Sequence, residues 1–383
     1  MNKVGILTLH RAVNNGAVLL AYCEQKILQQ LLPNSKVEIV DYSSTITRKY
    51  TLRNLIRRDF PFFDRGYWIK WHNLSRFVKQ NCELSSESCK TDDLGRVQRF
   101  IQRQGYDTVI VGSDIVWQVR EKSSFTQLPP NIYFLPEIKE IKKISFAASA
   151  DRSQFSLLDN ANLRQSLFRL LNDFQFITVR DEATGGFLKK LGFPETGFYF
   201  MPDPTILWDF SELVERPMIW NNVNKPLAGL AGGSRVIRAR IAELLIQKGY
   251  QVVDLLGNPA KEQLTVPSTY TLAQRLGVYS QFDLVITDRF HESILTMKLG
   301  HAPVIWMETV DRYTEPISKG RDLFQRLGIS DMIWRYEGGE VLLNLDDYLN
   351  KWQRLSIDVK ARFAVLREEA QTQLNRIQEL IEG

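Results

Sequence analysis

A short stretch of the chain combines residue types that hold an anion with one that moves a proton. The sequence TDRFHES, residues 287–293, follows the apolar run LVI. Arg289 carries a planar, permanently charged guanidinium that suits a carboxylate or a phosphate. His291 changes charge near neutral pH, so it can carry a proton to or from a bound ligand. The pattern predicts an anion site; the structural alternative is a surface ion pair for Arg289 and a backbone hydrogen bond for His291.

We expect this stretch to lie where a buried strand gives way to a helix. Asp288 is a suitable N-cap residue, which would place Arg289, Phe290 and His291 in the first helical turn. Free backbone N–H groups and the positive end of the helix dipole favour an anion there. A bound anion would in turn favour the charged form of His291, so ligand binding could load the proton.

The elements that must position these residues follow a regular alternation. A short apolar strand, a polar or Gly-rich turn and an amphipathic helix recur along the chain, as in α/β proteins with parallel sheets. The pattern breaks after residue 205, which predicts two Rossmann-like domains facing a cleft, residues 1–205 and 206–345. Residues 45–90 interrupt the first domain as an irregular insertion, basic and aromatic in its first part. Residues 346–383 form a predicted helix that could pack back on the first domain.

In such sheets ligands bind beyond the carboxyl ends of the strands, so the turns there supply further candidates. Arg180 follows a predicted strand, although Asp181 or Glu182 is an alternative partner that would form an ion pair with it. Gly233 and Ser234 lead into a helix, where glycine lets the backbone approach a phosphate. Asp114 ends another strand and would either face a ligand or cap the next segment.

Composition excludes several classes of protein. The chain has 383 residues, 44% hydrophobic and 24% charged, as in ordinary globular proteins. No apolar run approaches the ~20 residues of a membrane span and no secretory signal is recognisable, so we expect a cytoplasmic protein. The net charge of +5 is spread along the chain, which argues against nucleic acid as a partner.

The chain also lacks several recognisable chemical motifs. The three cysteines form no CxxC pair, and no His or Cys residues stand at metal-ligand spacing, so we expect neither disulfides nor a metal site. Dinucleotide, Walker and GxSxG motifs are missing, which argues against NAD, ATP and a serine hydrolase. Of the other histidines, His10 lies in the first strand-to-helix turn and could face a ligand, whereas His72 and His301 are expected to be structural.

One segment concentrates basic and aromatic residues. Residues 47–60 read TRKYTLRNLIRRDF, and residues 61–77 read PFFDRGYWIKWHNLSRF. The simpler interpretation is a solvated loop and helix face. The alternative is a surface that rests on anionic lipid headgroups or on a glycan-lipid phosphate. Residues 47–77 are therefore a candidate for peripheral contact with the inner face of a membrane.

Taken in order, the motifs resemble those of the polysaccharide pyruvyltransferases. GILTLHRAVNNGAVLLAY, YDTVIVGSDIVWQ, KKISFAASA, ITVRDEAT, MPDPTILW, LVITDRFHESI and SKGRDLFQRLGI follow one another as in that family, over about residues 3–329. The resemblance implies a GT-B-like pair of Rossmann-like domains. It also implies transfer of a pyruvyl group from phosphoenolpyruvate to two hydroxyls of a glycan sugar, with ketal formation and phosphate release, in the biosynthesis of capsules and exopolysaccharides.

The resemblance implies roles for individual residues on the donor side. Arg289 and His291 match the family's Arg-x-His motif, with His291 as the general acid and Arg289 holding the ligand's charge. Arg180 matches the arginine of its RD or RE turn and would bind phosphoenolpyruvate with Arg289. Lys319 or Arg321 would stand for a basic residue downstream of the histidine.

Other candidates complete the predicted site. Gly233 and Ser234 would contact phosphoenolpyruvate, which is a co-substrate, so that no cofactor is expected. On the acceptor side we expect Asp114 to orient or deprotonate a sugar hydroxyl, with His10 and Asn15 nearby.

The sequence leaves several points open. Many relatives have Ser-Phe-His-Gly where this chain has Arg-Phe-His-Glu, so Glu292 adds bulk and negative charge near the predicted site. The acceptor sugar, its linkage to a lipid and the oligomeric state are not specified by the sequence. Two other functions are compatible with these residues: a GT-B glycosyltransferase that uses a nucleotide sugar, and a non-catalytic protein that binds a glycan phosphate.

Overall fold

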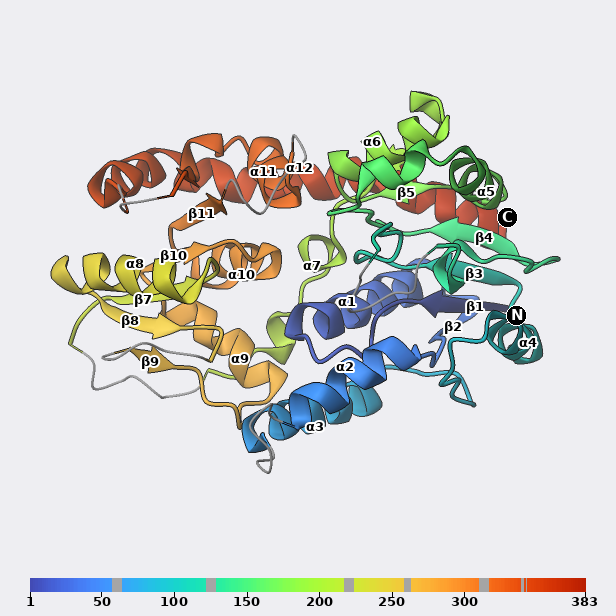
Figure 1. Ribbon diagram of the computed structural model, residues 1–383, viewed down its shortest axis with the longest axis horizontal. Helices are drawn as coiled ribbons and strands as arrows, with labels where there is room; N and C mark the ends of the chain where they lie inside the picture. Colours follow the sequence, from blue (N-terminus) through green and yellow to red (C-terminus); the bar gives the residue numbers. More distant parts are fainter. Residues whose placement is uncertain are drawn as a thin grey trace. The chain divides into compact units, whose positions relative to one another are not determined.

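The chain forms two compact units (Figure 1). The first comprises Met1–Trp208 and Leu366–Gly383, and the second comprises Asp209–Val365. The computed structural model describes residues 1–56, 64–121, 129–216, 224–257, 263–309, 317–338, 341 and 343–383.

The first unit is built on a parallel sheet of order β2-β1-β3-β4. Its strands are β1 (Asn2–Leu7), β2 (Ser35–Ile39), β3 (Thr108–Val111) and β4 (Lys142–Ser145). A two-stranded parallel sheet of β5 (Thr178–Val179) and β6 (Tyr199–Phe200) continues beside it, because Ala148 and Val179 form a bridge. Since all these strands are parallel, their carboxyl ends lie at one edge, where the predicted turns meet.

Side-chain caps decide where most helices of the first unit begin. Asn14, Ser44, Asp93 and Asp181 each accept a backbone N–H in the first turn of the helix that follows. The helices are α1 (Asn15–Leu31), α2 (Thr45–Leu55), α3 (Arg65–Asn81), α4 (Leu94–Gln104), α5 (Ala161–Leu171), α6 (Glu182–Leu191) and α7 (Pro204–Leu207).

The insertion at residues 45–90 was predicted to be irregular, and this prediction is wrong because the segment is largely helical. It contains α2 and α3, and α3 buries Leu74, Phe77 and Val78 on its inner face. The Phe77 ring packs edge-on against Tyr22 of α1 at 5.6 Å between centroids, which anchors α3 to the unit. Residues 57–63, part of the predicted membrane contact, lie outside the described residues.

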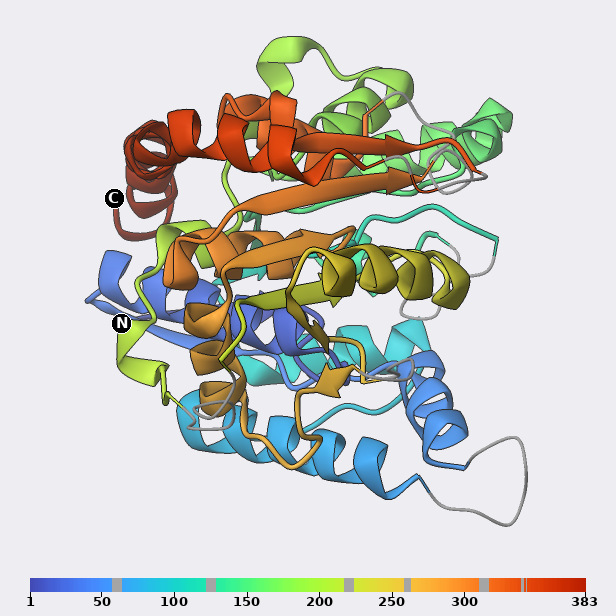
Figure 2. The same ribbon diagram turned by 90° about the vertical axis from the view of Figure 1, so that its left-hand side faces the viewer.

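The second unit contains a six-stranded parallel sheet of order β12-β11-β10-β7-β8-β9, whose arrows point the same way in Figure 2. Its strands are β7 (Leu227–Ala231), β8 (Gln251–Asp254), β9 (Leu264–Thr265), β10 (Leu284–Thr287), β11 (Val304–Thr309) and β12 (Ile333–Tyr336). Its helices include α8 (Arg235–Gln247), α9 (Leu272–Val278), α10 (Phe290–Leu295) and α11 (Lys319–Arg326). Strands β7, β10 and β11 are buried along their whole length, as expected for strands covered on both faces.

The last helix, α12 (Leu345–Glu382), is a single element of 38 residues. Its final segment belongs to the first unit and closes the amino edge of that sheet. There Asn2 donates to the carbonyl of Ile381, and Lys142 donates to that of Leu380 at 2.7 Å. These side chains, from the first residues of β1 and β4, satisfy carbonyls that the end of a helix otherwise leaves unpaired.

Candidate functional site

Arg180 lies at the centre of a buried cluster of charges in the first unit. It directly follows β5, is only 3% exposed, and donates from Nη1 to Asp203 Oδ2 at 2.8 Å and to Ser113 Oγ at 3.4 Å. Burial lowers the pKa of Arg180, but the nearby charges of Asp203, Asp114 and Asp181 outweigh it and raise that pKa. The guanidinium is therefore a permanent cation, held by carboxylates from neighbouring turns.

Asp114 occupies a strained turn after β3. Its φ of 95° lies in the left-handed region, which costs a non-glycine residue roughly 1–3 kcal/mol. Its side chain accepts the N–H of Ile115 at 2.8 Å, and its carbonyl accepts N–H groups of Val116 and Ser149. The structure thus shows the capping contact that the sequence offered as one alternative, on a side chain that is only half-buried.

His10 is bound into the fold at both ring nitrogens. It is 1% exposed, with Nδ1 3.3 Å from the carbonyl of Thr8 and Nε2 3.2 Å from Asp41 Oδ1. Arg11 donates to the same carboxylate at 2.8 and 2.6 Å. Burial raises the pKa of Asp41, but hydrogen bonds from His10 and Arg11 outweigh it and hold that pKa well below its usual range.

Asn15 begins α1, whereas its neighbour Asn14 provides the cap by accepting from Gly16 and Ala17. The Oδ1 atom of Asn15 is buried and has no hydrogen-bond partner among the described residues. A buried acceptor without a partner is costly, so a donor such as a ligand hydroxyl would be stabilising there.

Glu24 is a member of this cluster that the sequence analysis missed. It is fully buried on α1, and its Oε2 accepts the N–H of Ser113 at 3.2 Å. A Cβ on Gly112 would lie 2.5 Å from that oxygen, so the glycine gives the carboxyl its space. Burial raises the pKa of Glu24 well above its usual value, and the charge of Asp203 adds to the rise. The only sequence signal is a single acid within the apolar face of a helix.

Glu24→Gln would replace this buried carboxyl by an amide of nearly the same shape. Because the folded pKa is raised, wild-type stability is fully present below the unfolded pKa and is lost as pH rises towards the folded pKa. The free energy of unfolding of the variant, minus that of wild type, should therefore rise by about 1.4 kcal/mol for each pH unit between those two pKa values. Urea unfolding at pH values from about 4 to about 8 measures the difference, and a difference independent of pH would contradict the assignment.

In the second unit, Asp288 joins two turns at the carboxyl edge of the sheet. It is 1% exposed, accepts the N–H of Gly233 at 2.9 Å, and lies 3.1 Å from Arg289 Nε. It does not cap the following helix as predicted: the N-cap position of α10 is Arg289, which makes no side-chain capping bond. Gly232, with a φ of 132°, is required because an added Cβ would lie 2.5 Å from the Asp288 carboxyl carbon.

Gly233 and Ser234, which were predicted to contact phosphoenolpyruvate, both make hydrogen bonds within the second unit. The N–H of Gly233 is already bound by Asp288, so it does not point freely to a ligand. Ser234 caps α8 by accepting the N–H of Ile237 at 3.3 Å, and its side chain is exposed.

His291 and Lys319 both contact the Phe290 ring. The His291 ring packs edge-on against Phe290 at 5.5 Å, and Lys319 Nζ lies 5.5 Å from the centre of the same ring. Arg289 directly precedes Phe290 in the chain, and its side chain is 36% exposed, unlike the buried Arg180. An imidazole and a lysine on one aromatic ring, next to an arginine in the sequence, suit a small anion with a site for proton transfer.

Lys319 and Arg321 both lie on α11, but Lys319 contacts Phe290 whereas Arg321 pairs with an acid of β11. Ser318 caps α11 by accepting the N–H of Arg321 at 3.2 Å. A Cβ on Gly320 would lie 1.9 Å from the buried ring of Trp306, so the glycine lets the helix pack close to β11. Arg321 forms an ion pair with the largely buried Glu308.

Glu292, the residue that departs from the common pattern, lies half-buried on α10. Burial lowers the pKa of Arg275, while the charges of Tyr279 and Glu292 raise it. Burial raises the pKa of Tyr279 well above its usual value, and Glu292 adds to that rise. The charge of Glu292 therefore raises the pKa values of one residue on α9 and one in the turn that follows it.

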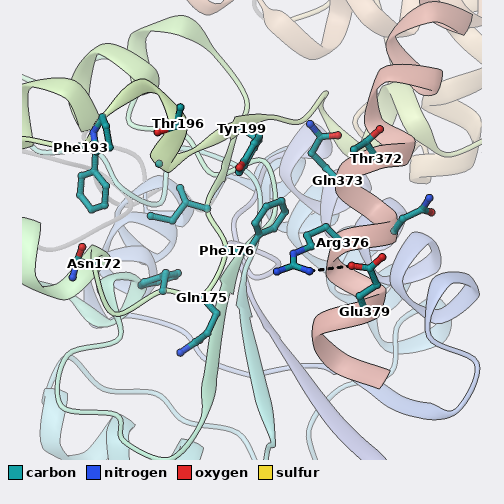
Figure 3. A pocket seen from close by; sticks show the side chains of 15 residues that line it. Asn172, Gln175, Phe176, Phe193, Thr196, Tyr199, Thr372, Gln373, Arg376 and Glu379 are labelled. Atoms are coloured by element: carbon teal, nitrogen blue, oxygen red, sulfur yellow. Dashed lines mark hydrogen bonds and ion pairs between the residues drawn. The ribbon is translucent and has the colours of Figure 1, made fainter. Parts of the chain in front are cut away.

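A large cavity of about 760 Å³ lies away from these turns, in the first unit (Figure 3). Figure 3 shows Phe176 and Tyr199 facing residues of α12 such as Gln373 and Arg376, and Arg376 pairs with Glu379 at 3.0 Å. The cavity opens at the amino ends of β5 and β6, and no predicted site residue lines it. Its position opposite the carboxyl ends makes it a poor candidate for the substrate site.

The described residues contain neither a membrane-spanning helix nor a metal-binding cluster. No helix there is both long and apolar enough to cross a membrane. In the same part of the chain, no group of three or more His, Cys, Asp or Glu side chains could hold a metal ion.

Several solved structures share the fold over the whole length of the chain. A UDP-N-acetylglucosamine 2-epimerase from Rickettsia bellii aligns with a TM-score of 0.58 at 9% identity, covering 100% of this chain and 97% of that one. A UDP-GlcNAc 2-epimerase from Neisseria meningitidis, bound to UDP-GlcNAc, gives 0.55 at 12% identity, covering 99% and 100%. The glycotransferase of kitacinnamycin gives 0.51 at 12%, covering 99% and 98%. This likeness confirms the predicted α/β, GT-B-like fold class.

Sequence comparison adds what the fold alone does not give. No match was found among curated proteins. A family model described as polysaccharide pyruvyl transferase matches residues 14–308, a range that contains Arg180, Arg289 and His291. The chain belongs to the polysaccharide pyruvyl transferase family.

Proposed function

We propose that this protein transfers a pyruvyl group from phosphoenolpyruvate to two hydroxyls of a glycan sugar, forming a cyclic ketal in surface polysaccharide biosynthesis. The observation that carries the proposal is the family match over residues 14–308. It is supported by His291 and Lys319 on the Phe290 ring and by Arg289 next to Phe290 in the chain, because phosphoenolpyruvate carries a carboxylate and a phosphate that cations can bind.

The proposed reaction begins with protonation of the methylene carbon of phosphoenolpyruvate by His291. The adjacent carbon becomes oxocarbenium-like, one sugar hydroxyl adds to it, and that hydroxyl loses its proton. The C–O bond to phosphate then breaks, and the second hydroxyl adds and loses its proton to close the ketal. Of the two hydroxyl protons lost, one balances the proton placed on the new methyl group and the other leaves with phosphate.

Each unit, taken by itself, offers groups that suit one of the two substrates. In the second unit, Arg289 and Lys319 would stabilise the negative charge of the donor and of the departing phosphate. In the first unit, Asn15 offers a buried acceptor and the half-buried Asp114 a carboxylate, groups that suit a sugar hydroxyl. Arg180 would fix the position of the turn that carries Asp114, as well as contributing positive charge.

A glycosyltransferase that uses a nucleotide sugar is the second candidate. It is favoured by one observation: structures that share the fold include a glycotransferase and an epimerase bound to UDP-GlcNAc. Thermal stabilisation separates the two candidates, since phosphoenolpyruvate should raise the melting temperature under the first proposal and UDP- or GDP-sugars under the second.

The direct experiment measures phosphate release from phosphoenolpyruvate with a panel of galactosides, mannosides and lipid-linked sugars. Acceptor-dependent release, with a ketal detected on the sugar, is the expected result. Saturable stabilisation by phosphoenolpyruvate without release on any acceptor would point instead to a protein that binds a glycan phosphate.

A further inference from the structure

Helices α2 and α3 of the first unit form a surface with exposed apolar side chains, called here the α2–α3 surface. Figures 1 and 2 show the two helices side by side at a margin of the unit. Only Thr47 of α2 is buried, whereas Leu52 is 57% exposed and Tyr50 43%. On α3, Trp68 and Trp71 are 40% and 38% exposed. Large apolar side chains exposed on neighbouring helices often mark a binding surface.

The charged residues of the two helices that form this surface are all positive. There are three Lys or Arg residues in α2 and four in α3, and neither helix contains Asp or Glu. The side chains of Arg48, Arg53 and Arg76 are exposed, and none forms an ion pair with another described residue. On α3, Arg76 shares a helical face with Trp68 and His72, whose rings stack at 5.4 Å.

A cavity of about 330 Å³ opens within this surface. Arg48 and Lys90 line it and have no ion-pair partner among the described residues, and Thr51 and Ser75 contribute hydroxyls. Its apolar part includes Leu52 and Trp71. Two cations with hydroxyl donors suit a phosphate, and the apolar wall suits the hydrocarbon that begins next to it.

We propose that the α2–α3 surface binds an anionic membrane, with the cavity holding the phosphate of a lipid headgroup. Exposed tryptophans prefer the interface between headgroups and acyl chains, and Lys and Arg side chains extend to the headgroups from an apolar face. Charge complementarity identifies the partner, because helices with seven cations and no acid would attract anionic lipid. This proposal goes beyond ketal transfer and stands without it.

The first test is sedimentation with vesicles of phosphatidylcholine containing phosphatidylglycerol. Each basic residue near such a surface contributes roughly a five-fold factor, so Arg48→Gln/Arg53→Gln/Arg76→Gln should lower the partition coefficient on the order of 100-fold. The matched control is Arg96→Gln/Arg99→Gln/Arg103→Gln, three exposed cations on α4, which should change it little. Equal loss in both variants, or equal binding to phosphatidylcholine alone, would overturn the proposal.

The second test asks which side chains enter the lipid. Acyl chains brominated near the headgroup should quench part of the tryptophan fluorescence, and Trp68→Phe/Trp71→Phe should remove that quenching while binding persists. Undiminished quenching in this variant would place the contact elsewhere and overturn the proposal.

Two further experiments distinguish binding to a membrane from binding to a soluble phosphate compound. Protection of α2 from proteolysis by inorganic phosphate or by an oligonucleotide, with none by anionic vesicles, would show a soluble partner and contradict membrane binding. Vesicle binding is measured without phosphoenolpyruvate, so His291→Ala should bind vesicles normally. Failure of ketal transfer and failure of membrane binding are therefore distinguishable.

Discussion

His291→Ala should lower the rate of phosphate release from phosphoenolpyruvate by roughly 100-fold to 10,000-fold, the usual contribution of a positioned general acid. The methylene carbon is unreactive towards a hydroxyl until it takes a proton, and His291 is the imidazole packed against Phe290, a ring that Lys319 also contacts. Phosphoenolpyruvate should still raise the melting temperature of the variant, because Arg289 and Lys319 are retained. Steady-state phosphate release and a thermal-shift titration measure the two effects.

The control is His301→Asn, which alters a histidine outside this group. His301 contacts the carbonyl of Met297 at 3.1 Å and has a φ of 55°, a conformation that asparagine tolerates. Its phosphate release should match wild type. If His291→Ala also turned over at a near-normal rate, another group would be the acid and the proposed role would be wrong.

Arg180→Met should destabilise the first unit by roughly 3–5 kcal/mol, as expected when one partner of a buried ion pair is removed. The variant would leave the buried carboxylates of Asp203 and Asp181 without the cation that neutralises them. Urea unfolding measures the loss.

A second substitution tests whether uncompensated charge is the cause. Adding Asp203→Asn to Arg180→Met removes one stranded charge, so the double variant should recover part of the lost stability. Lys189→Met breaks the exposed pair with Glu195 and should leave the unfolding midpoint unchanged. A double variant no more stable than Arg180→Met would show that Arg180 acts through packing instead.

Local patterns were sufficient to predict most elements, because their causes lie within a few residues. Asn14 and Asp181 are cap residues followed by amphipathic runs, and helices begin after each of them. Helix α2 of the 45–90 segment escaped prediction because it buries only Thr47. A helix that is polar or exposed almost all round carries no apolar periodicity to read.

The site was harder to predict because its partners are distant in sequence. Asp288 was assigned to its own helix, but it binds Gly233, which is 55 residues away. Whether Lys319 or Arg321 is the candidate ligand depends on the ion pair of Arg321 with Glu308, which lies on β11. Glu24 shows no motif at all, since its burial behind Ser113 arises only when α1 packs on β3.

The final segment of α12 has a consequence for how the protein is made. Leu366–Gly383 completes the first unit, yet it is synthesised after every residue of the second unit. Domains generally fold as they leave the ribosome, so the second unit can mature while the first still lacks the segment that covers its strand starts. The unit whose translation begins first is thus finished last, and nascent chains stalled before Leu366 should need chaperone protection there.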